Sequence, residues 1–108
     1  MAERFVLDEV TRDRQQKGRA YLEFLRKEAL SAGLYVLAPN AQDLQKPHAE
    51  DEIYYVLAGR ARFRAGNKDL PVMPGDLFYV AAGEPHHFHE IVEELRLLVF
   101  FAPAETSD

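Results

Sequence analysis

The stretch that decides the fold of this chain is DEIYYVLAGRARFRA, residues 51–65. Residues 53–57 are aromatic, β-branched or aliphatic, a composition typical of β-strands. Ala58 and Gly59 then offer a turn, and residues 60–65 alternate arginine with alanine and phenylalanine. An alternation with a period of two places the arginines on one face of a half-buried strand. The stretch therefore predicts two strands joined by a turn at Gly59.

Segments of the same character lie on both sides of this stretch. Strands are predicted over residues 34–37, 70–73, 77–80, 86–91 and 95–101. Turns at 74–76 and 82–85 separate them, and Pro71 marks an edge position or a strand end. Residues 21–25 fit either a helix or an edge strand, and the β character of the rest of the chain favours the strand. Many short strands broken by glycine and proline predict an all-β fold, a barrel or a sandwich.

A short helix is predicted before the strands, over residues 8–18. Asp8 is placed to cap its first turn, Glu9 lies in that turn, and Gly18 is placed to end it. The apolar face of this helix is thin, so we expect the helix on the surface of the molecule.

Length, composition and charge restrict the classes of protein. The 108 residues predict a single domain, residues 1–108, with a barrel core over residues 31–102. The chain has no cysteine, which excludes disulfides, thiolate metal sites and a cysteine nucleophile. Its net charge of -5 argues against binding a nucleic-acid backbone, which needs clustered positive charge. The sequence has no leader-like or membrane-spanning apolar run, so we expect a cytoplasmic protein that binds neither nucleic acid nor membrane.

The segment 95–101 is apolar on both faces over most of its length. A strand in a one-sided sheet alternates, so we expect both faces of this segment to be covered. One face of a strand in a small barrel meets the interior. The other is covered either by a second subunit, which predicts a homodimer, or by the N-terminal segment of the same chain.

Two segments, residues 45–52 and 83–90, hold all four histidines of the chain. An even number of positions separates His48 from Glu52, so an extended chain points both side chains to one face. His86 is placed to meet them from another strand. Two imidazoles and one carboxylate then form a triad with open coordination positions, suited to a divalent transition metal such as iron, manganese, nickel or zinc. The alternative is a set of surface histidines beside an acidic loop.

The residues around this triad resemble the two motifs of the cupin family. The first motif runs histidine, any residue, histidine, three or four residues, glutamate, six residues and glycine, and His48, Glu52 and Gly59 fall in its last three slots. The second motif ends in proline, any residue, glycine, two residues and histidine, and Gly83 and His86 match it. The resemblance implies a jelly-roll β-barrel behind the short N-terminal helix, with one divalent metal held by the two histidines and the glutamate.

The chain departs from these motifs at several slots. Lys46 stands in the first-histidine slot, and Ala81 stands where the second motif has proline. A protonated lysine cannot ligate a metal, so three protein ligands remain and the fourth position is left to water, Gln45 or Glu50. Glu90 stands where an asparagine is frequent, which makes it a candidate for contact with the ligands.

Alternation along the strands assigns the neighbouring side chains. His87 and His89 are expected to face away from the interior, at the surface or at an interface. The predicted interior wall, which forms a small and mostly apolar pocket beside the metal, consists of Tyr54, Val56, Phe78, Val80 and Phe88.

Cupins of this kind include dioxygenases, isomerases, decarboxylases and epimerases. The resemblance therefore implies a metal-dependent enzyme that acts on a small organic molecule, with Glu50 and Glu90 as the candidate catalytic bases. The alternative is a non-catalytic barrel that binds or senses a small ligand.

Overall fold

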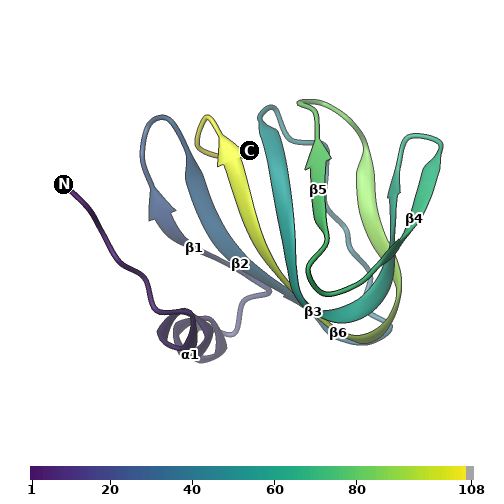
Figure 1. Ribbon diagram of the computed structural model, residues 1–108, viewed down its shortest axis with the longest axis horizontal. Helices are drawn as coiled ribbons and strands as arrows, with labels where there is room; N and C mark the ends of the chain where they lie inside the picture. The colour runs from purple at the N-terminus through teal and green to yellow at the C-terminus, as the bar shows by residue number, and fades with distance from the viewer. Residues whose placement is uncertain (107–108) are drawn as a thin grey trace.

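The protein is an antiparallel β-structure with one helix, and its computed structural model describes residues 1–106 (Figure 1). The elements in chain order are α1 (Leu7–Lys17), β1 (Tyr21–Arg26), β2 (Ser31–Leu37), β3 (Asp51–Ala65), β4 (Lys68–Val72), β5 (Leu77–Val80) and β6 (His86–Ala102). The predicted all-β class is confirmed, as are the strands predicted at 21–25 and 77–80.

The strands form one antiparallel sheet in the order β1-β2-β6-β3-β4, and β5 also pairs with β3. β3 has two partners along one edge, since Glu52 lies opposite Val80 of β5 and Ala61 lies opposite Val72 of β4. β3 and β6 pair along most of their lengths and bend together, so that the sheet curls into an open cup (Figure 1). This is the predicted jelly-roll fold, although the sheet does not close into a complete barrel. The edge position predicted from Pro71 is confirmed, because β4 is the last strand of the sheet.

The turn predicted at Gly59 is wrong, because β3 continues through it as one strand. Gly59 has a φ of 104°, and a Cβ on it would lie only 2.7 Å from the Cα of Leu95 in β6. The register between the two strands shifts around this point, from Val56 to Arg62. A glycine that adopts positive φ and admits a close backbone bends the paired strands instead of ending one. For the same reason the predicted strands 86–91 and 95–101 are one strand, β6.

The helix α1 begins one residue earlier than predicted and ends before Gly18, whose φ is 64°. The N–H of Gly18 donates to the carbonyls of Arg14 and Gln15 at 3.0 and 3.2 Å, so the predicted C-terminal glycine is confirmed. The cap predicted at Asp8 is wrong: Val6 occupies the N-cap without a side-chain bond, and Asp8 lies within the first turn, where the helix dipole favours a negative charge. Within residues 1–106, no helix is long and apolar enough to cross a membrane.

The two faces of the segment 95–101 have different neighbours. Leu95, Leu97, Val99 and Phe101 are buried in the main core inside the cup. On the outer face, Leu98 packs in a second cluster with Val10 of α1 and with Leu22, Leu34 and Val36 of β1 and β2. Arg96 donates to the Thr11 hydroxyl of α1 at 2.8 Å. The N-terminal segment therefore covers part of the outer face, as one of the two alternatives required, and the homodimer stays a prediction.

Candidate metal centre

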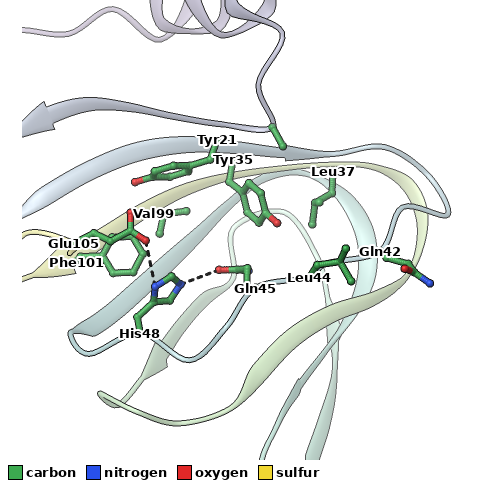
Figure 2. A pocket seen from close by; sticks show the side chains of 11 residues that line it. Tyr21, Tyr35, Leu37, Gln42, Leu44, Gln45, His48, Val99, Phe101 and Glu105 are labelled. Carbon is green, nitrogen blue, oxygen red and sulfur yellow. Dashed lines mark hydrogen bonds and ion pairs between the residues drawn. The ribbon is translucent and has the colours of Figure 1, made fainter. Parts of the chain in front are cut away.

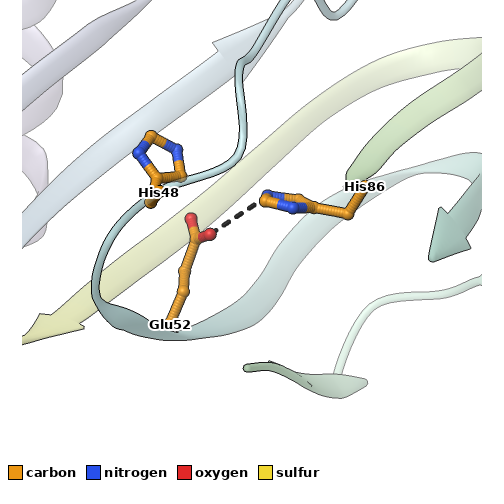
Figure 3. Close-up of side chains that lie close together, drawn as sticks. All are labelled: His48, Glu52 and His86. Carbon is orange, nitrogen blue, oxygen red and sulfur yellow. Dashed lines mark ion pairs between the residues drawn. The ribbon is translucent and has the colours of Figure 1, made fainter. Parts of the chain in front are cut away.

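The three side chains of the predicted triad lie together at the mouth of the cup. His48 comes from the loop before β3, Glu52 from the start of β3, and His86 from the first position of β6. One ligand atom of each lies within 4.8 Å of the others (Figure 3). The loop is fixed to the facing turn because the N–H of Gly83 donates to the His48 carbonyl at 2.7 Å. Sheet pairing and this loop contact thus bring together residues that are distant in sequence.

The orientation of His86 is set by main chain. Its Nδ1 lies 2.8 Å from the carbonyl oxygen of Glu84, and since a carbonyl only accepts, Nδ1 carries the proton. Nε2 then points inward, 3.1 Å from Oε1 of Glu52 and 3.0 Å from the Tyr54 hydroxyl. Burial by itself would lower the pKa of His86, but the Glu52 carboxylate and the Glu84 carbonyl outweigh it, and the pKa is raised.

His48 is held between two side chains (Figure 2). Its Nδ1 lies 3.2 Å from Oε2 of Glu105, and its Nε2 lies 3.2 Å from Oε1 of Gln45. Gln45 is itself oriented, because its Nε2 donates to Asp43 at 2.8 Å and its Oε1 accepts from the Tyr54 hydroxyl at 3.0 Å. The hydrogen bond with Glu105 raises the pKa of His48, against burial, which lowers it.

These contacts crowd hydrogen-bond acceptors around one point. With both Nδ1 atoms carrying protons, the Nε2 atoms of His48 and His86 present lone pairs, as do Oε1 of Gln45 and the carboxylate of Glu52. Tyr54 is the one donor with a proton to offer them among the residues that the structure describes. Neither buried Glu52 oxygen accepts a hydrogen bond in residues 1–106, and the contact of Oε1 with Nε2 of His86 is an ion pair only when His86 is protonated. Only a cation, either an added proton or a metal ion, satisfies such a set, so these residues fit a divalent metal.

The lysine in the first-histidine slot does not interfere with this arrangement. Lys46 is exposed and takes part in none of the ion pairs found in the described part of the chain. Its neighbour Gln45 turns inward instead and offers a neutral oxygen. Water, Gln45 and Glu50 were the candidates for the fourth ligand. Among the described residues, Gln45 is the one of these whose oxygen contacts a histidine of the triad.

The two predicted bases, Glu50 and Glu90, have partners outside the triad, and their catalytic role stays a prediction. Glu50 is buried, and its Oε2 accepts from the hydroxyl of Thr106 at 2.8 Å. Glu90 is exposed and pairs with Nδ1 of His89 at 3.4 Å. It stands where the second motif frequently has asparagine, which predicted a contact with the ligands, but its φ of 48° interrupts the alternation of β6 and leaves it exposed. Among residues 1–106, no hydrogen bond or ion pair joins either carboxylate to the triad. His87 is exposed, as expected.

A pocket of about 380 Å³ lies beside His48, and its wall differs from the predicted one (Figure 2). The predicted wall residues all lie in the main core, packed against one another and not against the pocket. β1, β2 and the end of β6 supply the wall instead, through Tyr21, Tyr35, Leu37, Val99 and Phe101. Glu105, which follows β6, also lines it. Residues outside the recognised motifs carry no sequence signal for this role, because only the curl of the sheet brings them to His48.

Comparison with known proteins identifies relatives across the whole chain. The cupin domain family matches residues 33–101. An uncharacterized protein of Streptomyces coelicolor, SCO3923, is 47% identical over 102 residues, which cover 94% of this chain and 97% of that protein. An oxalate-binding protein of Thermotoga maritima is 35% identical over 60 residues, which cover 56% of this chain and 50% of that protein. The crystal structure of TT1209 from Thermus thermophilus aligns with a TM-score of 0.77 and 28% identity, over 95% of this chain and 99% of that one.

Proposed function

The chain belongs to the cupin family, and from that membership we propose that it binds one divalent transition metal through His48, Glu52 and His86 and acts on a small organic molecule. The observation that carries the proposal is the excess of inward-facing acceptor atoms around a buried carboxylate that accepts no hydrogen bond in residues 1–106. A structural site would be expected to satisfy that carboxylate with protein donors.

The chain's own groups match the requirements of such a metal. In each histidine an acceptor lies next to Nδ1 and holds the proton there. Nε2 therefore keeps the lone pair that can bind a metal. Gln45 is oriented by Asp43 and offers its oxygen as the fourth ligand. Imidazole nitrogen with carboxylate and amide oxygen suits iron, manganese, nickel or zinc. With one carboxylate among four ligands, a divalent ion in the site retains positive charge.

The pocket beside His48 supplies the place for an organic molecule. Its aromatic and aliphatic wall favours a small, largely apolar ligand. When bound, the metal would supply Lewis acidity toward a carbonyl or enolate oxygen, or oxygen chemistry if it is iron. The side chains then act by binding and orienting the substrate against His48 and Gln45. A dioxygenase-, isomerase- or decarboxylase-like reaction is consistent with such a site.

Binding without turnover is the second candidate. The name of the Thermotoga relative records binding of oxalate, and neither predicted base contacts the triad in the described residues. A binding protein would bind the ligand without converting it into a product. An enzyme loses turnover while it remains folded when Glu52 is replaced.

The first test is the metal content of purified, untagged protein, measured by mass spectrometry. We expect close to one equivalent of metal in the wild type and a loss in both His48→Ala and His86→Ala. His87→Ala is the matched control, since it removes an exposed histidine next to His86 and leaves the triad intact. Absence of metal from the wild type after reconstitution with iron, manganese, nickel and zinc would sink the proposal.

A further inference from the structure

We propose that the segment of residues 104–106 is part of the metal site, with Glu105 as the positioning residue that selects the tautomer of His48. The inference rests on the proposed function and extends it to a part of the chain beyond the matched cupin region, residues 33–101. It assigns a role to a carboxylate that neither motif contains.

The segment is tied to the sheet although it has no regular structure. The N–H of Ala104 donates to the Glu28 carbonyl at 3.5 Å, and the N–H of Glu105 donates to the Ser31 hydroxyl at 2.9 Å. Ser31 is fully buried, so this second bond lies in a region shielded from water. Because the backbone is held at both Ala104 and Glu105, the Glu105 side chain has few positions available. In the structure it points toward His48.

Glu50 provides the outer anchor of the segment. Its Oε2 accepts from both the hydroxyl and the N–H of Thr106, at 2.8 and 3.3 Å. Glu50 is only 4% exposed, and in residues 1–106 Thr106 partners its Oε2, while its Oε1 is buried without a hydrogen bond. This contact makes Glu50 the residue that holds the end of the segment, here called the latch.

Glu105 itself acts on His48. Acceptors lie at 3.2 Å from both ring nitrogens, Oε2 of Glu105 from Nδ1 and Oε1 of Gln45 from Nε2; the charged carboxylate is the stronger acceptor, so it holds the single proton of the neutral imidazole on Nδ1. The lone pair is then on Nε2, on the side of Gln45 and Tyr54. Without Glu105, His48 is free to take the other tautomer and to rotate in its loop. Carboxylates in this position also raise the basicity of the ligating nitrogen.

The test compares zinc affinity, measured by competition with a chromophoric chelator, in wild type and variants. Glu105→Ala is expected to weaken zinc binding by about 10–100-fold, the usual cost of losing a group behind a ligand. Glu105→Gln retains an acceptor for Nδ1–H but not the charge, so we expect it to recover part of the loss. Glu93→Ala, which removes an exposed carboxylate from β6, should leave affinity unchanged.

A second readout separates positioning from general stability. Long-range ¹H–¹⁵N spectra of the metal-free protein, recorded at a pH at which His48 is neutral, report which nitrogen of His48 carries the proton. We expect an Nδ1–H signal in wild type and Glu105→Gln, and its loss or exchange broadening in Glu105→Ala. Thr106→Val, which removes only the hydroxyl contact of the latch, should give a smaller loss of affinity in the same direction.

The outcomes distinguish this inference from the proposed function. If the wild type fails to bind zinc and the other metals, both are overturned. If the wild type binds zinc and Glu105→Ala binds it equally well with an unchanged Nδ1–H signal, only the role of Glu105 is overturned. Thermal unfolding of each variant without metal shows whether it is folded, and Glu105→Gln keeps the inference testable if the alanine variant is not.

Discussion

His86 and His48 offer nitrogens to the same point but are held in different ways. His86 begins a strand, and a main-chain carbonyl two residues before it fixes its ring. His48 lies in a loop, and the side chains of Gln45 and Glu105 fix its ring. Main-chain support cannot be removed by substitution of the supporting side chain, whereas side-chain support can. In the half of the site around His86, the ring orientation therefore does not depend on the identity of a supporting side chain. In the half around His48, it depends on the side chains of Gln45 and Glu105.

The largest effect should appear when the two histidines are replaced one at a time. Loss of His86 removes the more rigid ligand, so His86→Ala should weaken zinc binding by more than about 100-fold, beyond the cost of losing an outer residue. His48→Ala should weaken it less than His86→Ala does but more than Glu105→Ala does, because Gln45 and water remain on that side while a ligand is lost. Titration of zinc into the metal-free proteins measures both. Equal losses would show that the two halves are equally preorganised.

The next prediction concerns Glu52, which both halves share. Glu52→Gln should abolish stoichiometric metal binding while the melting temperature of the metal-free protein stays level or rises. The substitution removes a buried negative charge that accepts no hydrogen bond in residues 1–106. The N–H groups of the new amide can donate to the acceptor atoms around it. Metal analysis and thermal unfolding without metal provide the two readouts. A fall of several degrees in the metal-free melting temperature would show that the carboxylate is stabilising by itself.

The pH dependence is expected to be of intermediate size. The pKa values of both histidines are raised in the folded, metal-free protein, so their stabilisation is complete below an unfolded value of about 6.5. It is lost as the pH rises through the raised folded values. The metal-free protein should therefore melt at lower temperature as the pH rises above about 6.5, while the stabilisation by zinc grows over the same window. Melting curves with and without zinc across this range test it, and a melting temperature that climbs with pH in the metal-free protein contradicts it.

The smallest effect should follow substitution of Lys46, the residue in the first-histidine slot. Its side chain is exposed, so Lys46→Ala should change zinc affinity by less than about twofold. Lys46→His should not tighten binding either, because Gln45 already faces the histidines on that side. A gain of tenfold or more in Lys46→His would mean that the loop readily turns its side chains around, and that the half of the site around His48 is looser than its contacts indicate.

The interior of the strands was predictable because it depends on local alternation. Tyr54, Val56, Val80 and Phe88 are buried where the period of two placed them. Prediction failed where glycine or positive φ changes the direction of the chain. Gly59 bends a strand that its composition suggested would end, and Glu90, with a φ of 48°, is exposed although its slot in the second motif placed it beside the ligands. Both failures are backbone effects that a count of positions does not include.

The sequence by itself determined the all-β class, the single glycine that ends the helix, and the residue types of the triad His48, Glu52 and His86. These follow from composition and from spacing within segments, which act over a few residues. Only the tertiary structure decided that Glu105 stands behind His48, that Gln45 faces it, and that the pocket opens toward β1 and β2. Such contacts join segments far apart in the chain, and their distances depend on how far the whole sheet curls, a property that no short stretch of sequence specifies.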